Sequence, residues 1–249
     1  FSFNESSENQ CDWIIPIKYY SKNKNEKIEN SKLISKKSNK IKNISNKPSD
    51  ITIFNENSAG FYKTIYPKAF HNKLIGELKK NINIIPSEER LGLLSDTYIL
   101  LKANKISPEF YLNLLPAFMS ENNPYIWKYL CGSLRSIDLK LYETSIYKNY
   151  FSYISNLLNH INIEIDWNFD NTTSETEQLM KATLLENLSY FQNKDITTKA
   201  KNIFNNYNSK NKEKIHPNLK RPLFLARAYE GKSEDFDKIW KLYLESDSQ

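Results

Sequence analysis

Residues 55–67, Asn-Glu-Asn-Ser-Ala-Gly-Phe-Tyr-Lys-Thr-Ile-Tyr-Pro, separate two hydrophobic patterns in this chain of 249 residues. Before the segment, apolar and polar residues alternate, as at Trp13, Ile15 and Ile17, which is typical of β-strands. After it, apolar residues recur at the spacing of amphipathic helices almost to the last residue. The segment therefore predicts a change of fold class within the chain.

The residues of this junction are suited to a packed turn between two kinds of structure. Gly60 can adopt a positive φ or let a neighbouring chain pass closely. Phe61, Tyr62, Ile65 and Tyr66 offer large surfaces to bury, and Pro67 can open a helix but not continue one. We therefore expect a packed junction that leads directly into a helix.

The region before the junction indicates part of an antiparallel sheet. Residues 1–20 read as strand, with Pro16 at an edge or bulge position because proline cannot donate to a sheet ladder. Residues 51–54 read as a further strand. Residues 21–50 are rich in Lys, Asn and Ser with isolated apolar residues, so we expect a long, mobile loop between strands.

After the junction, helix start and stop signals occur at regular intervals. A short polar side chain precedes a proline, or is followed three residues later by glutamate, at the predicted starts Ser107, Asn123 and Ser174. Ser87, Asp195 and Ser233 are expected to cap further helices. Gly231 predicts a helix end, and one long helix is expected near residues 140–158. Short loops place successive helices antiparallel, so we expect a mainly α fold, an α-solenoid of antiparallel helix pairs.

The charge distribution argues against a nucleic-acid partner. The chain carries a net charge of +6, but residues 18–47 alone hold ten Lys and two Glu. This segment lacks aromatic residues after Tyr20, which a surface that stacks single-stranded bases would need. No apolar run approaches the roughly 20 residues that span a bilayer. We therefore expect neither nucleic-acid binding nor a membrane span in this segment.

No catalytic or metal-binding motif stands out. A zinc protease site of the His-Glu-x-x-His type needs two imidazoles one helical turn apart. His71, His160 and His216 lie far apart in the sequence, and none is followed directly by glutamate. Glycine-rich phosphate loops and Gly-x-Ser-x-Gly motifs are also absent. We therefore expect no catalytic residue, metal ligand or cofactor in this segment.

The arginines are the more informative charged residues. The chain has 31 Lys but only four Arg, so an arginine indicates a contact that needs a planar, bidentate donor. Arg90 is expected to be structural, paired with Asp96 or a buried carbonyl. Arg221 lies beside Lys220 at a predicted helix start and is the better candidate for binding a ligand. The alternative for each arginine is an ordinary ion pair between packed helices. The four are Arg90, Arg135, Arg221 and Arg227.

The junction also carries a family resemblance. Residues 57–66, with their Asn, Gly-aromatic-Tyr-basic core and following Tyr, resemble a segment of zinc aminopeptidases of the aminopeptidase N type, including the puromycin-sensitive, endoplasmic-reticulum and tricorn-interacting-factor enzymes. In that family this segment joins a small β-sandwich to a helical C-terminal domain. Lys63 and Thr64 stand where the family usually has Arg-Val. Further matching segments, in the same order, are Trp13–Ile17, Arg90–Leu101, Asn123–Trp127, Asn218–Arg221 and Phe236–Tyr243.

The resemblance implies a domain arrangement and a function. Residues 1–57 would be the end of the β-sandwich, and residues 58–249 an incomplete helical-repeat domain whose last helix still has an apolar face. The helices would close the peptide chamber of the parent enzyme and contribute to substrate access and recognition. The catalytic zinc and its ligands would lie outside this segment, in the catalytic domain of the same protein. The alternative is a stand-alone helical-repeat scaffold that binds a protein partner.

The same resemblance gives Arg221 and Lys220 a specific role. An aminopeptidase holds the N-terminus of its peptide at the zinc, so the carboxylate of a long peptide points into the helical domain. A guanidinium with a second cation and the amides of a helix start is well suited to bind that carboxylate. We therefore predict that Arg221 and Lys220 bind peptide substrates.

Overall fold

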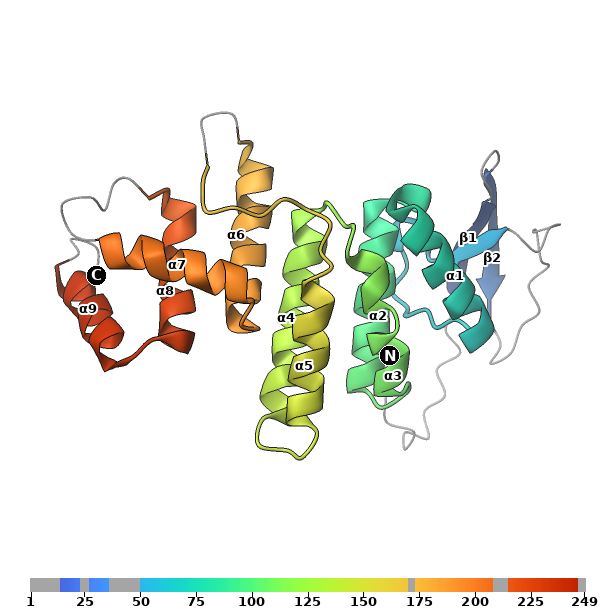
Figure 1. Ribbon diagram of the computed structural model, residues 1–249. Coiled ribbons are helices and arrows are strands. Elements are labelled where there is room, and N and C mark those ends of the chain that lie inside the picture. Colours follow the sequence, from blue (N-terminus) through green and yellow to red (C-terminus); the bar gives the residue numbers. More distant parts are fainter. Residues whose placement is uncertain (1–13, 23–26, 36–49, 170–172, 208–214, 246–249) are drawn as a thin grey trace. The chain divides into compact units, whose positions relative to one another are not determined.

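A computed structural model describes residues 14–22, 27–35, 50–169, 173–207 and 215–245 (Figure 1). Within these ranges the chain is mainly helical and has a small three-stranded antiparallel sheet near its N-terminal end, as the sequence predicts. The chain divides into two compact units, residues 1–118 and 119–249. The predicted division after residue 57 falls inside the first unit, because the helices that follow the junction share a core with the strands.

The sheet has the strand order β2-β1-β3. Within the described residues, both predicted strand regions contain a strand. These strands, β1 (Ile15–Lys22) and β3 (Ile51–Phe54), pair antiparallel from Tyr19–Phe54 to Lys22–Ile51. Residues 1–13 of the first predicted region lie outside the described residues. Pro16 lies on the part of β1 that extends beyond β3, so only β2 pairs with β1 at that point. This explains how a strand with neighbours on both sides tolerates a residue that lacks an N–H group.

The prediction of a continuous loop over residues 21–50 is wrong in part. Residues 27–34 form β2 (Lys27–Ile34), which pairs with β1 along its whole length, and Ser21 and Lys22 belong to β1. The side chains of β2 are almost all exposed, so the strand is held by backbone pairing and has no buried apolar face. The rest of the predicted loop, at residues 23–26 and 36–49, lies outside the described residues.

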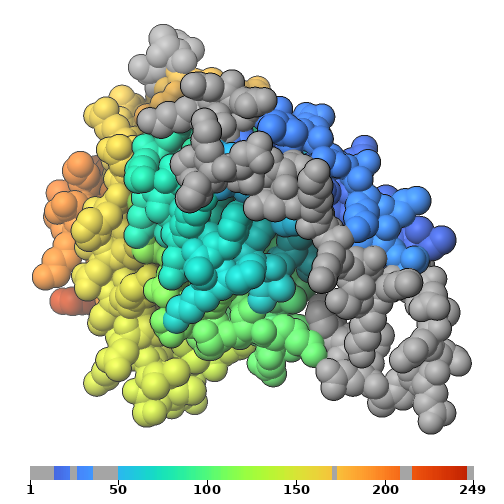
Figure 2. Space-filling model, turned by 90° about the vertical axis from the view of Figure 1, so that its right-hand side faces the viewer, coloured from blue at the N-terminus to red at the C-terminus, as the bar shows by residue number. Residues whose placement is uncertain are grey.

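In the first unit, short helices pack against the sheet. Figure 2 shows α1 at the surface of this unit in teal, with the strands in blue to its right. The buried core combines Tyr20 and Ile51 from the strands with Leu74, Leu78 and Leu94 from the helices. The elements are η1 (Glu56–Ser58), α1 (Lys68–Lys80), η2 (Ile82–Ile84), α2 (Ser87–Lys102), α3 (Pro108–Leu112) and η3 (Leu115–Phe118), where η denotes a 3₁₀ helix.

The second unit consists of helices joined by loops. Helix α6 packs against both α4 and α8, and α8 in turn packs against α7 and α9. The core residues Ala200, Phe204 and Leu223 join α7 to α8. Within the described ranges, no helix combines the length and apolar character that crossing a bilayer requires. The helices are α4 (Pro124–Leu141), α5 (Tyr147–Leu158), α6 (Glu175–Tyr190), α7 (Lys194–Asn206), α8 (Pro217–Glu230) and α9 (Ser233–Leu244).

The predicted helix starts at Ser107, Asn123 and Ser174 are confirmed. Each side chain accepts a hydrogen bond from a backbone amide in the first turn of the helix that follows it, which satisfies a donor without an intrahelical partner. Gly231 is the C-cap of α8, as predicted. The predicted caps at Ser87, Asp195 and Ser233 are wrong by one or two residues: Ser87 and Ser233 are the first residues of α2 and α9, and Asn193 caps α7.

The prediction of one long helix over residues 140–158 is wrong. Helix α4 ends at Leu141 and α5 begins at Tyr147, with Glu143 between them at φ 65°. A left-handed residue reverses the chain direction at the end of a helix, and this role usually belongs to Gly or Asn. Because a glutamate takes it here, the sequence gives no sign of the break.

Candidate functional site

The junction segment is held by the side chain of Asn55, the residue that follows β3. Its Oδ1 accepts a hydrogen bond from the Gly60 N–H at 2.7 Å, and its Nδ2 donates to the carbonyls of Gly60 at 3.2 Å and Tyr62 at 3.3 Å. One side chain therefore fixes the backbone on both sides of Phe61.

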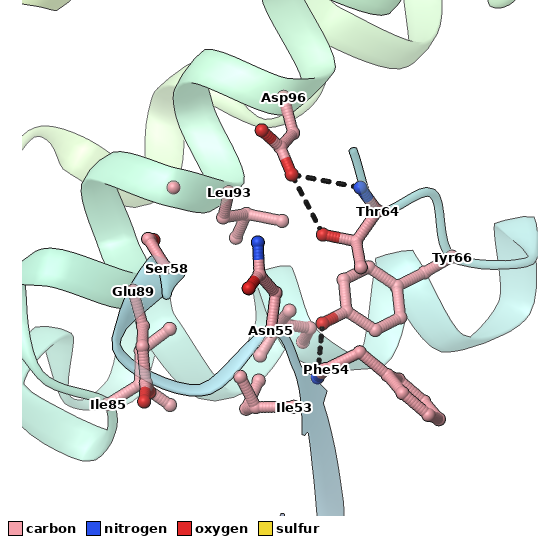
Figure 3. A pocket seen from close by; sticks show the side chains of 12 residues that line it. Ile53, Phe54, Asn55, Ser58, Thr64, Tyr66, Ile85, Glu89, Leu93 and Asp96 are labelled. Carbon is pink, nitrogen blue, oxygen red and sulfur yellow. Dashed lines mark hydrogen bonds between the residues drawn. The ribbon is translucent and has the colours of Figure 1, made fainter. Parts of the chain in front are cut away.

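The second anchor of the junction is Asp96 on α2, which is buried. Its carboxylate accepts hydrogen bonds from the N–H and hydroxyl of Thr64, each at 2.9 Å, and pairs with the ammonium of Lys63 at 2.9 Å (Figure 3). Nearby, the Tyr66 hydroxyl accepts from the Phe54 N–H at 3.1 Å. Asp96, predicted from the sequence as a partner of Arg90, thus binds the junction instead.

The junction is closed to ligands beneath these anchors. The space enclosed by the residues in Figure 3 has a volume of about 10 Å³, which is too small for a substrate. Gly60 has a negative φ; the left-handed conformation falls on Asn55, Asn57 and Ser58. A Cβ on Gly60 would lie 2.1 Å from the Tyr62 ring, so close approach is what requires glycine there.

Two of the arginines are structural. The buried Arg90 donates from Nη1 to the carbonyl of Ile85 at 2.8 Å, which confirms the prediction of a buried carbonyl partner. Arg227 on α8 is also buried and pairs with Asp235 on α9 at 2.6 Å. Both guanidiniums are therefore engaged inside the protein and are not presented to a ligand.

The other two arginines meet at one carboxylate, that of Glu186 on α6. Arg135 on α4 donates from Nη1 to Glu186 Oε1 at 2.8 Å and from Nε to Asn187 Oδ1 at 2.9 Å. Arg221 on α8 donates from Nε to Glu186 Oε2 at 3.1 Å. Three helices therefore contribute to an Arg135–Glu186–Arg221 cluster, in which two positive charges face one negative charge.

Arg221 and Arg135 are presented differently within this cluster. The side chain of Arg221 is 74% exposed, whereas that of Arg135 is 24% exposed and lies 5.0 Å from the ring centroid of Tyr190. Of the three nitrogens of the Arg221 guanidinium, only Nε has a hydrogen-bond partner among the described residues. The two Nη groups therefore face solvent. Lys220 precedes it in the first turn of α8, where the predicted helix start is confirmed.

Sequence reasoning missed Glu186 and the pairing of Arg135 with Arg221. One feature of the sequence could have pointed to Glu186 as a partner for a cation. It lies next to the buried residues Leu185 and Asn187, at the border of the apolar face of α6. The pairing itself joins residues 35 and 51 positions apart in the chain. No local pattern encodes a contact of that separation.

The residues present do not fit a zinc site. His71 is buried against the Phe110 ring, His160 Nδ1 contacts the Asn156 carbonyl, and His216 Nδ1 accepts from the Asn218 N–H. Within the described ranges, no three His, Cys, Asp or Glu side chains are grouped as metal ligands would be. Burial raises the pKa of the Cys131 thiol to about 12, so this sulfur stays protonated at neutral pH.

Comparison with known proteins gives the chain its family. The profile of the ERAP1-like C-terminal domain matches residues 51–249. "Aminopeptidase 2, mitochondrial" of Saccharomyces cerevisiae is 25% identical over 236 residues, which are 93% of this chain and 24% of the yeast protein. Human "Aminopeptidase Q" is 32% identical over 129 residues, or 52% of this chain and 13% of that protein.

A third relative, human "Aminopeptidase N", is 22% identical over 203 residues, or 77% of this chain and 20% of that protein. The chain therefore spans about a quarter or less of the length of these relatives. The resemblance recognised from the sequence motifs is confirmed. On the match over residues 51–249, the chain belongs to the ERAP1-like C-terminal domain family.

Proposed function

We propose that the chain is the C-terminal part of a zinc-dependent aminopeptidase. The observation that carries the proposal is the family match over residues 51–249, together with relatives that are all aminopeptidases. The zinc and its ligands would belong to a catalytic domain elsewhere in the same polypeptide, because the residues described here do not form a metal site. The segment would not hydrolyse peptides by itself.

In this proposal the sheet is the end of a β-sandwich over residues 1–57, and the helices of residues 58–249 belong to an α-solenoid. The helices would close the chamber that holds the peptide. The packing of α6 between α4 and α8, and of α8 on α7 and α9, is the arrangement that stacked antiparallel helix pairs produce. It brings Arg135, Glu186 and Arg221 from alternate helices to one surface.

The surface at Arg221 and Lys220 would bind the carboxylate at the far end of a peptide. Glu186 binds the Nε donor of Arg221. The two Nη groups of Arg221 remain to donate a pair of hydrogen bonds to a second carboxylate. The cluster of Arg135, Glu186 and Arg221 has an excess of one positive charge, and Lys220 adds another. An incoming carboxylate would therefore be attracted even though Glu186 is already bound.

The experiment is a comparison of two substrate classes in the full-length enzyme. A contact of this type contributes roughly 1.5–3 kcal/mol, or about a tenfold to hundredfold effect on kcat/KM. Arg221→Ala should lower kcat/KM by about that factor for peptides of roughly ten residues and leave a single-residue chromogenic substrate nearly unchanged. Lys199→Ala, on the exposed surface of α7, is the matched control and should change neither.

Two results would contradict the recognition role. An equal loss for both substrate classes would show that Arg221 serves catalysis or folding in general. A lower melting temperature of Arg221→Ala with unchanged length dependence would identify the Arg221–Glu186 pair as structural. A polypeptide without any aminopeptidase activity would overturn the proposal as a whole and favour the stand-alone scaffold.

A further inference from the structure

Phe61 is an aromatic side chain that the first unit leaves fully exposed, with 100% of its surface accessible. The exposure does not come from a loose segment. The Asn55 amide holds the backbone at Gly60 and Tyr62, on both sides of Phe61, and Asp96 holds Thr64. A side chain presented by a fixed loop loses little conformational entropy on binding, which is typical of the aromatic anchors of protein interfaces.

A cavity of about 400 Å³ lies beside this side chain. It is lined by the loop residues 58–63 and by Ile99 of α2, and its walls are apolar at Phe61 and Ile99. A space of this size is comparable to the small-ligand pockets of proteins and accommodates one or two side chains. An exposed aromatic side chain and an apolar cavity thus lie side by side on this surface. The space beneath the junction, in contrast, is closed to ligands.

Exposed charged residues of both signs lie near this cavity, among them Glu88, whose carbonyl oxygen accepts a hydrogen bond from the lining residue Ser58 at 3.3 Å. Lys63 lines it with 42% of its side chain accessible, and Lys102 is exposed one helical turn beyond Ile99 on α2. The carboxylate of Asp96 is buried and bound to Lys63 and Thr64, so the charge of Lys63 is already balanced and Lys102 is the cation offered to a partner. A complementary surface would therefore present an apolar side chain with a carboxylate placed to meet Lys102.

We propose that Phe61 and this cavity dock a segment of the catalytic region of the same polypeptide, one that carries an apolar side chain beside a carboxylate. This inference rests on the proposed function, which supplies that region. A fixed, exposed aromatic next to an apolar cavity marks an interface surface. The chain spans 24% of its yeast relative, so the relative carries ample additional polypeptide that could cover such a surface.

Photo-crosslinking in the full-length enzyme tests the docking surface without a substrate. Phe61→p-benzoylphenylalanine should form, on irradiation, a crosslink within one polypeptide to a segment outside residues 1–249 that contains Asp or Glu. Leu33→p-benzoylphenylalanine is the matched control, because Leu33 is 67% exposed on β2 and does not line the cavity. It should not capture the same segment.

Hydrogen exchange provides a second measurement on a milder variant. Phe61→Ser should make amide exchange at least about tenfold faster in residues 58–63 and in the crosslinked segment, because it removes the anchor of the interface. Leu33→Ser should leave both segments unchanged. A variant that keeps its overall exchange pattern is folded, so the comparison does not depend on activity.

The outcomes separate this inference from the proposed function. Crosslinks confined to residues 1–249, crosslinks to a second copy of the protein, or no crosslink would overturn the docking surface. If the crosslink fails while hydrolysis remains sensitive to peptide length through Arg221, only the docking surface is wrong. If the crosslink forms while Arg221→Ala has no effect on long peptides, only the recognition role is wrong.

Discussion

The hydroxyl of Tyr20 on β1 donates a hydrogen bond to the carboxylate of Glu89 on α2, and both residues are buried. The other oxygen of Glu89 accepts from the Asn57 N–H of the junction at 3.4 Å. One carboxylate therefore links the sheet, the junction and the first long helix. Burial is also the main reason that the pKa of Glu89 is raised.

Tyr20→Phe should destabilise the chain by about 1–3 kcal/mol, because it removes the donor and leaves the buried Glu89 oxygen without that partner. The ring is kept, so lost packing contributes little. Urea unfolding followed by circular dichroism measures the change. Tyr125→Phe is the control, since Tyr125 is largely exposed and its replacement should alter stability by less than about 0.5 kcal/mol. Equal effects of the two variants would contradict the linking role of Tyr20.

His71 should make stability fall as the pH is lowered through the histidine range. Burial against the Phe110 ring is the main reason that its pKa lies below the ordinary value. The unfolded chain therefore binds a proton more readily than the folded one, and stability is lost as the pH falls below about 6.5, by at most about 1.4 kcal/mol per pH unit. His71→Leu should remove this component of the slope between about pH 6.5 and 5. An unchanged slope in denaturant titrations would show that His71 stays uncharged in both states or charged in both.

Replacement by alanine should change the stability of the chain in opposite directions at two glycines. A Cβ on Gly231 would lie 2.2 Å from the backbone oxygen of Arg227, so Gly231→Ala should destabilise the chain by about 1–3 kcal/mol through forced movement of the α8 end. A Cβ on Gly132, inside α4, would meet nothing within 4 Å. Gly132→Ala should therefore stabilise the chain by about 0.5–1 kcal/mol. Melting curves that shift in the same direction for both variants would contradict this account.

Replacing Gln192 by glycine should stabilise the chain. It follows the end of α6 with φ 57°, and the Asn193 N–H reaches back to the Leu188 carbonyl at 2.8 Å, as in helix ends that reverse through a left-handed residue. Gln192→Gly should raise the free energy of unfolding by up to about 1 kcal/mol, because it relieves the left-handed strain. Gln192→Val should lower it, since a β-branched residue is disfavoured at positive φ. The reverse order in chemical denaturation, with Gln192→Val more stable than Gln192→Gly, would refute the strain argument.

Much of the helical part could be predicted because its signals are local. Asn123 with Pro124, or Ser174 with Glu177, states where a helix begins without reference to the rest of the chain. The break after Leu141 could not be predicted, because Glu143 takes a conformation that its side chain does not favour. Strand β2 could not be predicted either, since its stabilisation comes from backbone pairing with β1 and leaves no apolar alternation in the sequence.

The candidate site was predictable only in part. The scarcity of arginine indicated that Arg221 has a specific contact, and a helix start beside it was also predicted. The sequence could not show that Glu186 holds Arg221 and Arg135 together, because such contacts depend on how α4, α6 and α8 pack. The exposure of Phe61 was likewise not foreseen: its size argued for burial, and the Asn55 clamp that turns it outward is a three-dimensional feature.

The polar composition of β2 has a consequence for solubility. In the part of the chain that the structure describes, β2 pairs only with β1, so its far side is an edge of the described sheet. Charged side chains on such an edge, here Lys27, Glu29 and Lys32, disfavour the addition of a strand from a second molecule. These charged residues prevented the prediction of β2 from its hydrophobic pattern. The same residues protect the sheet from edge-to-edge aggregation.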